Sequence, residues 1–213
     1  MKIDIISDVV CPWCIVGYKQ LEHALEKTGI DAQIEWHAFE LNPEMVVEGE
    51  NLRDHIATKY DTTVEASRAA RDNLMKIGVD LGFLFRFSDD MRIVNTFKAH
   101  QLLHWCGEEG YQHELKMALF SAYFTDGKDI SDVNVLLDVA EKAGLDRGKA
   151  QQVLNDQQCS ADVRAEEKLW MSRGVQGVPA MVFNQKYLVT GAQGVENYTA
   201  ILQDIVAESA NSD

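Results

Sequence analysis

The sequence Cys11-Pro12-Trp13-Cys14 restricts the folds available to this chain more than any other segment. An apolar run over residues 3–10 precedes it and predicts a buried strand, and the apolar spacing after Trp13 predicts a helix. The two cysteines therefore lie at a strand-to-helix junction. Two intervening residues in the first helical turn bring the sulfur atoms within bonding distance, and Pro12 fits that turn because the N–H that it lacks would have no partner there. This arrangement predicts two thiols that can react together.

The apolar pattern of the whole chain has the order β-α-β, then a long helical block, then β-β-α. The first helix ends at Gly29, and a turn at Asn184-Gln185 joins the last two strands. The expected elements are a strand over 3–10, a helix over 13–28, a strand over 32–38, helices within 48–173, strands over 180–183 and 187–190, and a helix over 195–206. We therefore predict an α/β core formed by residues 1–47 and 174–213, with an all-helical insertion over residues 48–173.

Two local patterns lie inside the helical block. Thr62 and Glu65 have the spacing of a capping box, which predicts that a helix begins at Thr62. Phe83, Phe85 and Phe87 alternate in a predicted loop. Ordinary core packing is the favoured interpretation of these rings, and the lining of an apolar cleft between insertion and core is left open.

The charge balance argues against two classes of partner. Asp and Glu total 34 against 20 Lys and Arg, which gives a formal net charge of −14. Such a surface repels phosphate backbones and anionic lipids, so we expect neither a nucleic-acid partner nor a membrane partner. Asp4 and Asp8 interrupt the first apolar run, so we expect no signal peptide, and four cysteines are too few for a secreted disulfide scaffold. We therefore expect a cytoplasmic protein.

A zinc site is the main alternative for Cys11 and Cys14. Such a site needs two further Cys or His ligands at short spacing. Cys106 and Cys159 are isolated on different predicted helices, and the addition of His104 still leaves the set one ligand short. We therefore expect no metal site. Cys106 and Cys159 are most simply buried thiols, although a second redox pair between them is left open.

Pro179 is the second informative position, because it directly precedes the first strand of the returning pair. A proline that starts a strand indicates an edge or a turn. Judged by itself, the Val178–Pro179 bond is expected to be trans, since cis bonds make up only about 5–6% of X–Pro bonds.

Taken together, several stretches resemble the thioredoxin superfamily, most closely the DsbA-like oxidoreductases and, within these, the cytoplasmic FrnE-type group. The resemblance covers nearly the whole chain. The matching stretches are Ser7-Asp8-Val9-Val10-Cys11-Pro12-Trp13-Cys14, Phe39-Glu40-Leu41-Asn42-Pro43, Ala118-Leu119-Phe120-Ser121-Ala122-Tyr123-Phe124, Gly174-Val175-Gln176-Gly177-Val178-Pro179 and Thr190-Gly191-Ala192-Gln193.

The resemblance implies a thioredoxin-like fold with a large all-helical insertion. It also implies that the Val178–Pro179 bond is cis, that this pair packs against the active-site disulfide, and that the Val178 backbone can pair with a bound substrate strand. Phe39, Asn42 and Pro43 follow the second strand where the insertion departs, so we expect them to help to wall a substrate groove.

These features predict a thiol–disulfide oxidoreductase. A helix N-terminus favours a thiolate, so we expect a low pKa for Cys11. Cys11 then forms a mixed disulfide with the substrate, Cys14 resolves it, and Trp13 offers an aromatic surface beside them. Asp8 is either a proton acceptor for Cys14 or a capping or turn residue near the helix start. Trp13 stands where DsbA has histidine and cannot stabilise a thiolate by charge, so we expect a less oxidising pair.

The substrate is expected to be a thiol or disulfide, carried by a protein or by a small molecule. No cofactor is expected, although glutathione is left open as a co-substrate, as is a homodimer. A glutathione-dependent isomerase or transferase of the kappa-like branch is the alternative enzyme class. Proteins of that branch usually present serine at the position of Cys11 and lack the second cysteine, so Cys14 argues against it. A redox-inactive binding or chaperone module is a third interpretation.

Overall fold

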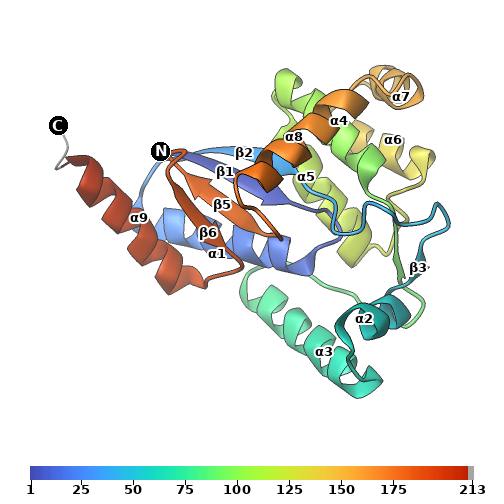
Figure 1. Ribbon diagram of the computed structural model, residues 1–213, viewed down its shortest axis with the longest axis horizontal. Coiled ribbons are helices and arrows are strands. Elements are labelled where there is room, and N and C mark those ends of the chain that lie inside the picture. The colour runs from blue at the N-terminus through green and yellow to red at the C-terminus, as the bar shows by residue number, and fades with distance from the viewer. Residues whose placement is uncertain (211–213) are drawn as a thin grey trace.

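A four-stranded sheet forms the centre of the protein in the computed structural model, which describes residues 1–210 (Figure 1). The strand order is β2-β1-β5-β6. Strand β1 pairs in parallel with β2 and antiparallel with β5, and β5 pairs antiparallel with β6. The strands are β1 (Lys2–Ser7), β2 (Gln33–Ala38), β5 (Ala180–Phe183) and β6 (Tyr187–Thr190).

Helices cover both faces of this sheet. Figure 1 shows α1 (Pro12–Thr28) and α9 (Val195–Ala210) side by side on one face, and α8 (Ser160–Ser172) on the other. The predicted end of α1 is confirmed, since Gly29 has the left-handed backbone (φ 66°) that allows its N–H to bond the Leu25 carbonyl. Within residues 1–210 no helix is long and apolar enough to cross a bilayer.

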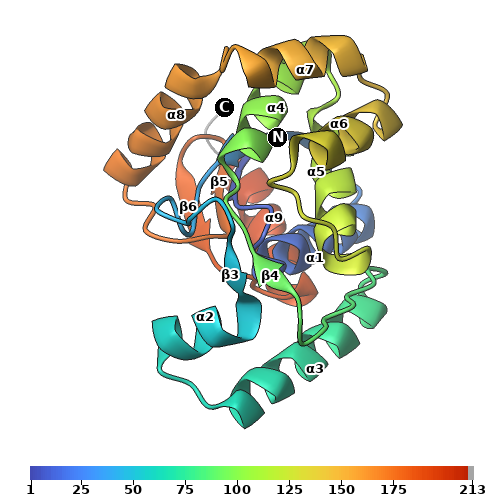
Figure 2. The same ribbon diagram turned by 90° about the vertical axis from the view of Figure 1, so that its right-hand side faces the viewer.

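The block between the two halves of the sheet is helical, apart from one short strand pair. Its elements are β3 (Glu50–Asn51), α2 (Leu52–Tyr60), α3 (Val64–Asp80), β4 (Arg92–Ile93), α4 (Phe97–Glu109), α5 (Gln112–Phe120), the π-helical turn η1 (Ser121–Thr125), α6 (Val133–Lys142), α7 (Arg147–Asn155) and α8. Figure 2 shows α2 and α3 together at one end of the molecule, where β3 and β4 connect them to the rest. The predicted thioredoxin-like α/β fold with a large helical insertion is therefore confirmed, although the β3–β4 pair shows that the insertion is not all-helical as predicted.

The start of α3 differs from the prediction by one residue. Thr63, and not Thr62, is the N-cap, because its extended backbone (ψ 160°) places its hydroxyl oxygen 3.1 Å from the Ala66 N–H that it accepts. Adjacent threonines make either cap plausible from sequence. Which of the two threonines caps α3 depends on which of them has an extended backbone.

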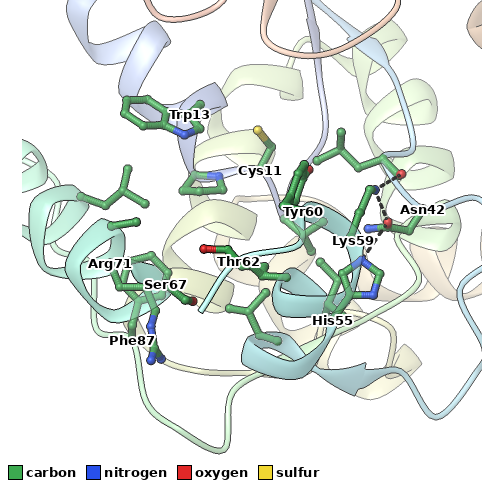
Figure 3. Close-up of a pocket in the computed structure, with 18 of the residues that line it drawn as sticks. Cys11, Trp13, Asn42, His55, Lys59, Tyr60, Thr62, Ser67, Arg71 and Phe87 are labelled. Carbon is green, nitrogen blue, oxygen red and sulfur yellow. Dashed lines mark hydrogen bonds between the residues drawn. The ribbon is translucent and has the colours of Figure 1, made fainter. Parts of the chain in front are cut away.

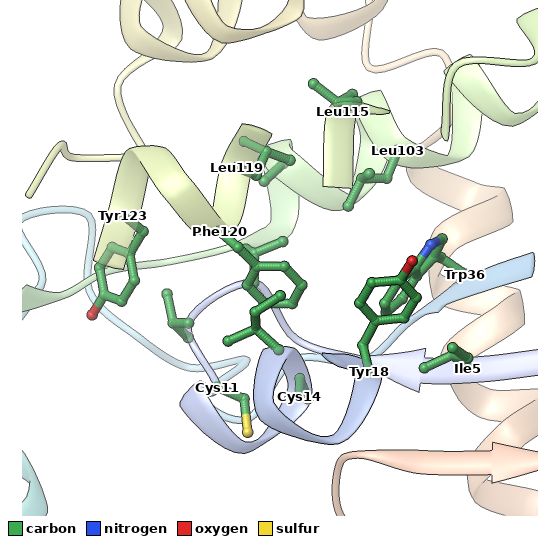
Figure 4. Close-up of a cluster of buried hydrophobic side chains, with 14 of the residues drawn as sticks. Ile5, Cys11, Cys14, Tyr18, Trp36, Leu103, Leu115, Leu119, Phe120 and Tyr123 are labelled. Atoms are coloured by element: carbon green, nitrogen blue, oxygen red, sulfur yellow. The ribbon is translucent and has the colours of Figure 1, made fainter. Parts of the chain in front are cut away.

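The apolar core is continuous from the sheet into the block (Figure 4). Trp36 of β2 packs against Tyr18 of α1, with ring centroids 5.1 Å apart, and against Phe120 of α5 at 6.3 Å. The side chain of Gln112 in α5 bonds both the N–H and the carbonyl of Trp36 at 2.9 Å. Helix α5 is thus attached to the sheet by apolar packing and by hydrogen bonds.

Helix α5 runs directly into the π-helical turn η1, where the Asp126 N–H bonds the Ser121 carbonyl five residues earlier, at 3.0 Å. In this turn Tyr123 and Phe124 are both buried. The Tyr123 hydroxyl donates to the Arg92 carbonyl at 2.8 Å, which connects the turn to β4.

The absence of a side chain at Gly78 positions the segment that follows α3. A β-carbon at Gly78 would lie 2.5 Å from both the Phe83 carbonyl oxygen and a ring carbon of Phe85. The segment can therefore lie directly on the helix, where Phe85 is buried against the rings of Phe83 and Phe124. Core packing is thus the role of Phe85, as expected.

We predict that Gly78→Ala lowers the free energy of unfolding by about 1–3 kcal/mol, because the new methyl group overpacks a backbone contact. Gly107→Ala is the matched control. Its β-carbon would meet only the Gln112 side chain, at 3.4 Å, so it should stabilise α4 by about 0.5–1 kcal/mol. Urea unfolding measures both changes, and equal effects at the two positions would contradict this account.

Candidate active site

The two cysteines occupy the start of α1. Cys11 is the N-cap residue and Pro12 the first residue of the helix, and the Cys14 N–H bonds the Cys11 carbonyl at 3.1 Å. Both are free thiols. Cys11 retains 4% of its surface and Cys14 none, so only Cys11 is within reach of a partner molecule.

The loop before β5 closes over this pair. The Val178–Pro179 peptide bond is cis. The Cys11 thiol lies 3.7 Å from the Val178 carbonyl oxygen, to which it can donate. Pro179 lies close to α1, because a β-carbon at Gly17 would be 3.2 Å from its ring. A residue with a side chain at position 17 would therefore press directly on Pro179.

A buried carboxylate lies below the pair. Asp8 is fully buried at the end of β1, where it accepts a hydrogen bond from the Leu41 N–H at 2.8 Å and contacts His100 Nε2 at 3.3 Å. Burial favours the neutral acid, but these partners outweigh it and hold the pKa of Asp8 below its usual value. Its side chain caps no helix, because the first turn of α1 has no side-chain cap. The capping interpretation of Asp8 is therefore wrong, whereas its turn role is confirmed, because the Asp8 carbonyl accepts a hydrogen bond from the Cys11 N–H at 3.2 Å.

A buried ammonium group lies beside this carboxylate. Lys116 of α5 is 1% exposed, donates to the Ser7 carbonyl at 3.3 Å, and lies 5.2 Å from the ring centroids of both Trp36 and Phe120. Burial lowers the pKa of Lys116 to about 8, even though the neighbouring Cys14 and Asp8 favour its charged form. Sequence reasoning missed this residue, since a lysine on an amphipathic helix normally indicates a solvated face.

The predicted low pKa of Cys11 is wrong for the dithiol form. The pKa of Cys11 is raised well above its usual value, first because its proton is held in a hydrogen bond to Cys14 and second because it is buried. Burial also acts to raise the pKa of Cys14, but the Cys11 thiol, the Ser7 hydroxyl and the Lys116 charge outweigh burial and lower it. In the dithiol form these interactions favour a thiolate at Cys14 over one at Cys11.

A second polar cluster lies at the β2 edge. His37 is nearly buried, with Nε2 2.9 Å from Asp4 and Nδ1 2.7 Å from Glu166. Within residues 1–210, only Asp4, Glu35 and His37 place three potential metal-ligating atoms together, all within 4.8 Å. Lys2 already forms ion pairs with both of these carboxylates, at 3.2 and 2.8 Å, so their charge has a partner.

A cavity of about 490 Å³ opens beside Cys11, between the core and the α2–α3 end of the block (Figure 3). Of the residues predicted for the site, it is lined by Cys11, Pro12, Trp13, Asn42 and Val178. The other lining residues are Val10, Leu41, Leu52, His55, Ile56, Lys59, Tyr60, Thr62, Ala66, Ser67, Ala70, Arg71, Leu74, Phe87, Ile93 and Phe124. No sequence pattern connects the α2 and α3 residues to Cys11, because their position depends on how the block folds back.

The groove prediction is wrong for Phe39 and Pro43. Phe39 packs instead into a separate apolar cluster with Ile6, Trp170 and Val175. Pro43 is exposed on the loop after β2 and does not line the cavity. Asn42 alone of the three faces the cavity, where its side-chain oxygen accepts from Lys59 at 2.6 Å.

Cys106 and Cys159 are both buried and unpaired, as expected for thiols in a helical core. Burial raises the pKa of Cys106 to about 12, and its thiol donates to the Leu103 carbonyl at 3.4 Å. Such a group is a poor nucleophile.

Comparison with known proteins gives consistent results. A family model described as the DSBA-like thioredoxin domain matches residues 2–203. The protein YwbO of Bacillus subtilis strain 168 is 26% identical over 206 residues, which cover 96% of each chain. The crystal structure of probable DsbA oxidoreductase SCO1869 from Streptomyces coelicolor is similar with a TM-score of 0.91 at 32% identity, covering 98% of this chain and 91% of that one. A 2-hydroxychromene-2-carboxylate isomerase shares the fold with a TM-score of 0.75 at 17% identity, over 100% of both chains.

We predict that Lys116→Met raises the apparent pKa of the first thiol to ionise, because a nearby positive charge that favours the Cys14 thiolate is removed. The ultraviolet absorbance of the thiolate, followed against pH in the reduced protein, measures this value. Lys168→Met, at an exposed position of α8, makes the same charge change and should leave the titration unaltered. An unchanged midpoint in Lys116→Met would show that the buried ammonium does not act on the pair.

Proposed function

The chain belongs to the DSBA-like thioredoxin domain family, as the sequence predicted, and we propose that it is a thiol–disulfide oxidoreductase that works through Cys11 and Cys14. The observation that carries the proposal is the unequal placement of the two sulfurs. Cys11 lines a cavity, whereas Cys14 is fully covered and lies beside a buried cation. Cys11 can therefore contact a substrate, while Cys14 can carry the negative charge of a thiolate.

In the reducing direction, Cys11 gives its proton to Cys14 and attacks a substrate disulfide. A bond forms between Cys11 and one substrate sulfur, and the other sulfur leaves as a thiolate and takes up a proton. Cys14 then loses its proton and attacks the Cys11 sulfur, which closes the Cys11–Cys14 disulfide and releases the second substrate thiol. The substrate gains two electrons and the pair loses two. The reverse sequence oxidises a dithiol substrate.

Lys116 supports the Cys14 half of this cycle. When the Cys11–Cys14 disulfide is attacked at Cys11, Cys14 is the leaving group, and a thiolate leaves more readily when its pKa is low. The Lys116 charge lowers the pKa of Cys14. Asp8 lies in the same buried region, 3.3 Å from His100 Nε2, and its lowered pKa makes it a weaker base than an ordinary carboxylate, so its role as the proton acceptor for Cys14 stays a prediction.

A glutathione-dependent isomerase or transferase is the second candidate. The size of the cavity beside Cys11 favours it, because about 490 Å³ suits a small molecule. The presence of Cys14 favours the oxidoreductase, since an isomerase of that kind needs no resolving thiol. Glutathione fits either role as a co-substrate. Membership of the FrnE-type group, a cytoplasmic location and a homodimer stay predictions.

We predict that Cys14→Ala accumulates mixed disulfides at Cys11 when it is exposed to a cell extract, because nothing resolves them. Mass spectrometry of the adducts identifies the partner, and Cys11→Ala is the control that should trap none. Protein adducts would indicate a protein-directed enzyme, and glutathione alone would favour the second candidate. An absence of any adduct would overturn the proposed function.

We also predict a reduction potential more negative than the value of about −120 mV known for DsbA. Trp13 occupies the position at which a histidine would stabilise the nucleophile by charge. Equilibration with glutathione redox buffers measures the potential, and a value near that of DsbA would contradict the prediction.

A further inference from the structure

The cavity beside Cys11 has an unusual charge for this chain. Among its lining residues there is no Asp or Glu, although the whole sequence has 34 acids against 20 bases. The charged residues that do line it are Lys59 and Arg71, together with His55. Figure 3 shows Arg71 and Ser67 on one side of the cavity and Lys59 and His55 on the other, with Cys11 above them. An acidic protein thus lines this pocket with basic side chains and no acidic one, although Arg71 and His55 each contact a carboxylate outside the lining, Asp89 at 3.4 Å and Glu50 at 2.7 Å.

Arg71 and Ser67 carry hydrogen-bonding atoms that are buried and unused. Arg71 is 7% exposed and Ser67 is 4% exposed. Among residues 1–210, neither Arg71 Nε nor the Ser67 hydroxyl has a hydrogen-bond partner. The two remaining nitrogens of Arg71 reach the Ser88 carbonyl at 3.3 Å and the Asp89 carboxylate at 3.4 Å. Buried donors without partners are unfavourable, so a bound acceptor would supply what the protein does not.

Lys59 carries a positive charge that, unlike that of Arg71, has no acidic partner among residues 1–210. Its ammonium donates to two neutral oxygens, the Leu41 carbonyl at 3.0 Å and the Asn42 side chain at 2.6 Å. No carboxylate of the described residues 1–210 forms an ion pair with it. Lys59 is exposed, so its positive charge can attract an anionic ligand that approaches the cavity from solvent.

The remainder of the wall is largely apolar. Leu52, Ile56, Leu74, Phe87, Ile93 and Phe124 contribute to it. A ligand that fits must therefore combine an apolar body with an anionic group. A volume of about 490 Å³ lies within the usual range for small-molecule sites, about 300–1,000 Å³.

We propose that this cavity binds a small-molecule disulfide or thiol that has an apolar body and a carboxylate. The carboxylate is held by Arg71 and Ser67, and the sulfur is presented to Cys11. Arg71 matches this role because a guanidinium binds carboxylates through several N–H donors. The inference rests on the proposed function and names the substrate class of the same site. An extended protein segment, whose backbone is neutral, has no need of such an anchor.

The reaction with such a substrate is balanced without a further reagent. The reduced Cys11–Cys14 pair supplies two electrons, the substrate S–S bond is broken, and the products are the Cys11–Cys14 disulfide and two thiols. The first product leaves when Cys11 forms the mixed disulfide, and the second when Cys14 closes the ring.

The test compares two aromatic disulfides that differ in charge. 5,5′-Dithiobis(2-nitrobenzoate) bears a carboxylate on each ring, and 4,4′-dithiodipyridine is neutral at the pH of the assay. Each releases a coloured thiol when reduced protein attacks it, so stopped-flow absorbance gives both rates as a function of reagent concentration. The neutral reagent reports the reactivity of Cys11, and the anionic reagent reports the anchor as well.

We expect Arg71→Met to slow the anionic reagent by about tenfold or more at low concentration, since a charged hydrogen bond is lost, and to change the neutral reagent by less than about twofold. Ser67→Ala should act in the same direction more weakly. Arg68→Met is the matched control, because it removes the same charge from an exposed position of the same helix, outside the cavity. It should change neither rate.

Equal slowing of both reagents in Arg71→Met would assign Arg71 to the fold or to Cys11 reactivity and would overturn the carboxylate anchor. Unchanged rates with both reagents would overturn it too. Thermal unfolding of Arg71→Met, together with the rate of the neutral reagent, distinguishes a folded variant from a damaged one. If the wild-type protein reacts with neither reagent, the proposed function fails first. Reaction with the neutral reagent and no response to Arg71 refutes the further inference alone.

Discussion

The ammonium group of Lys116 is the interaction on which the rest of the site depends. A charge at the centre of a folded protein is tolerated only when other charges and dipoles compensate for the lost water. Here the Ser7 carbonyl, the Asp8 carboxylate, the Cys14 sulfur and two aromatic rings provide that compensation. Ser7, Asp8, Cys14 and Trp36 come from β1, the turn after it, α1 and β2, whereas Phe120 and the lysine itself come from α5. The insertion is therefore part of the redox centre and not an addition to its outside.

The two sulfurs have separate environments because of this arrangement. Cys14 faces the buried charges, and Cys11 faces the cavity that α2 and α3 complete. The buried positive charge thus comes from the α4–α5 side of the block. The α2–α3 side provides the cavity wall that a substrate would contact. The core itself contributes only the two thiols and the loop at Pro179. A chemistry that needs two cysteines consequently uses residues from almost the full length of the chain.

Local patterns predicted the elements well, because strands, helices and turns depend on neighbouring residues. The apolar run before Cys11, the helix that ends at Gly29 and the turn at Asn184-Gln185 are of this kind. The predictions that failed concern features that depend on tertiary structure. The helix N-terminus argued for a thiolate at Cys11, but hydrogen bonds from the Cys11 thiol and the Ser7 hydroxyl, together with the charge of the sequence-distant Lys116, favour a thiolate at Cys14. The burial of Lys116 and the place of Arg71 in the cavity wall have no local signature, and Phe39 packs into a different cluster from the one predicted.

The π-helical turn at Ser121–Thr125 has a consequence for how related sequences are aligned. An ordinary α-helix advances by about 100° per residue, so a turn that bonds five residues back holds the equivalent of one inserted residue. Deletion of a single residue there would restore regular spacing and rotate the side chains that follow. Tyr123 would lose its bond to Arg92, and Phe124 would leave the cavity wall. A one-residue gap at this place in a relative therefore marks a differently shaped cavity, even where both cysteines are retained.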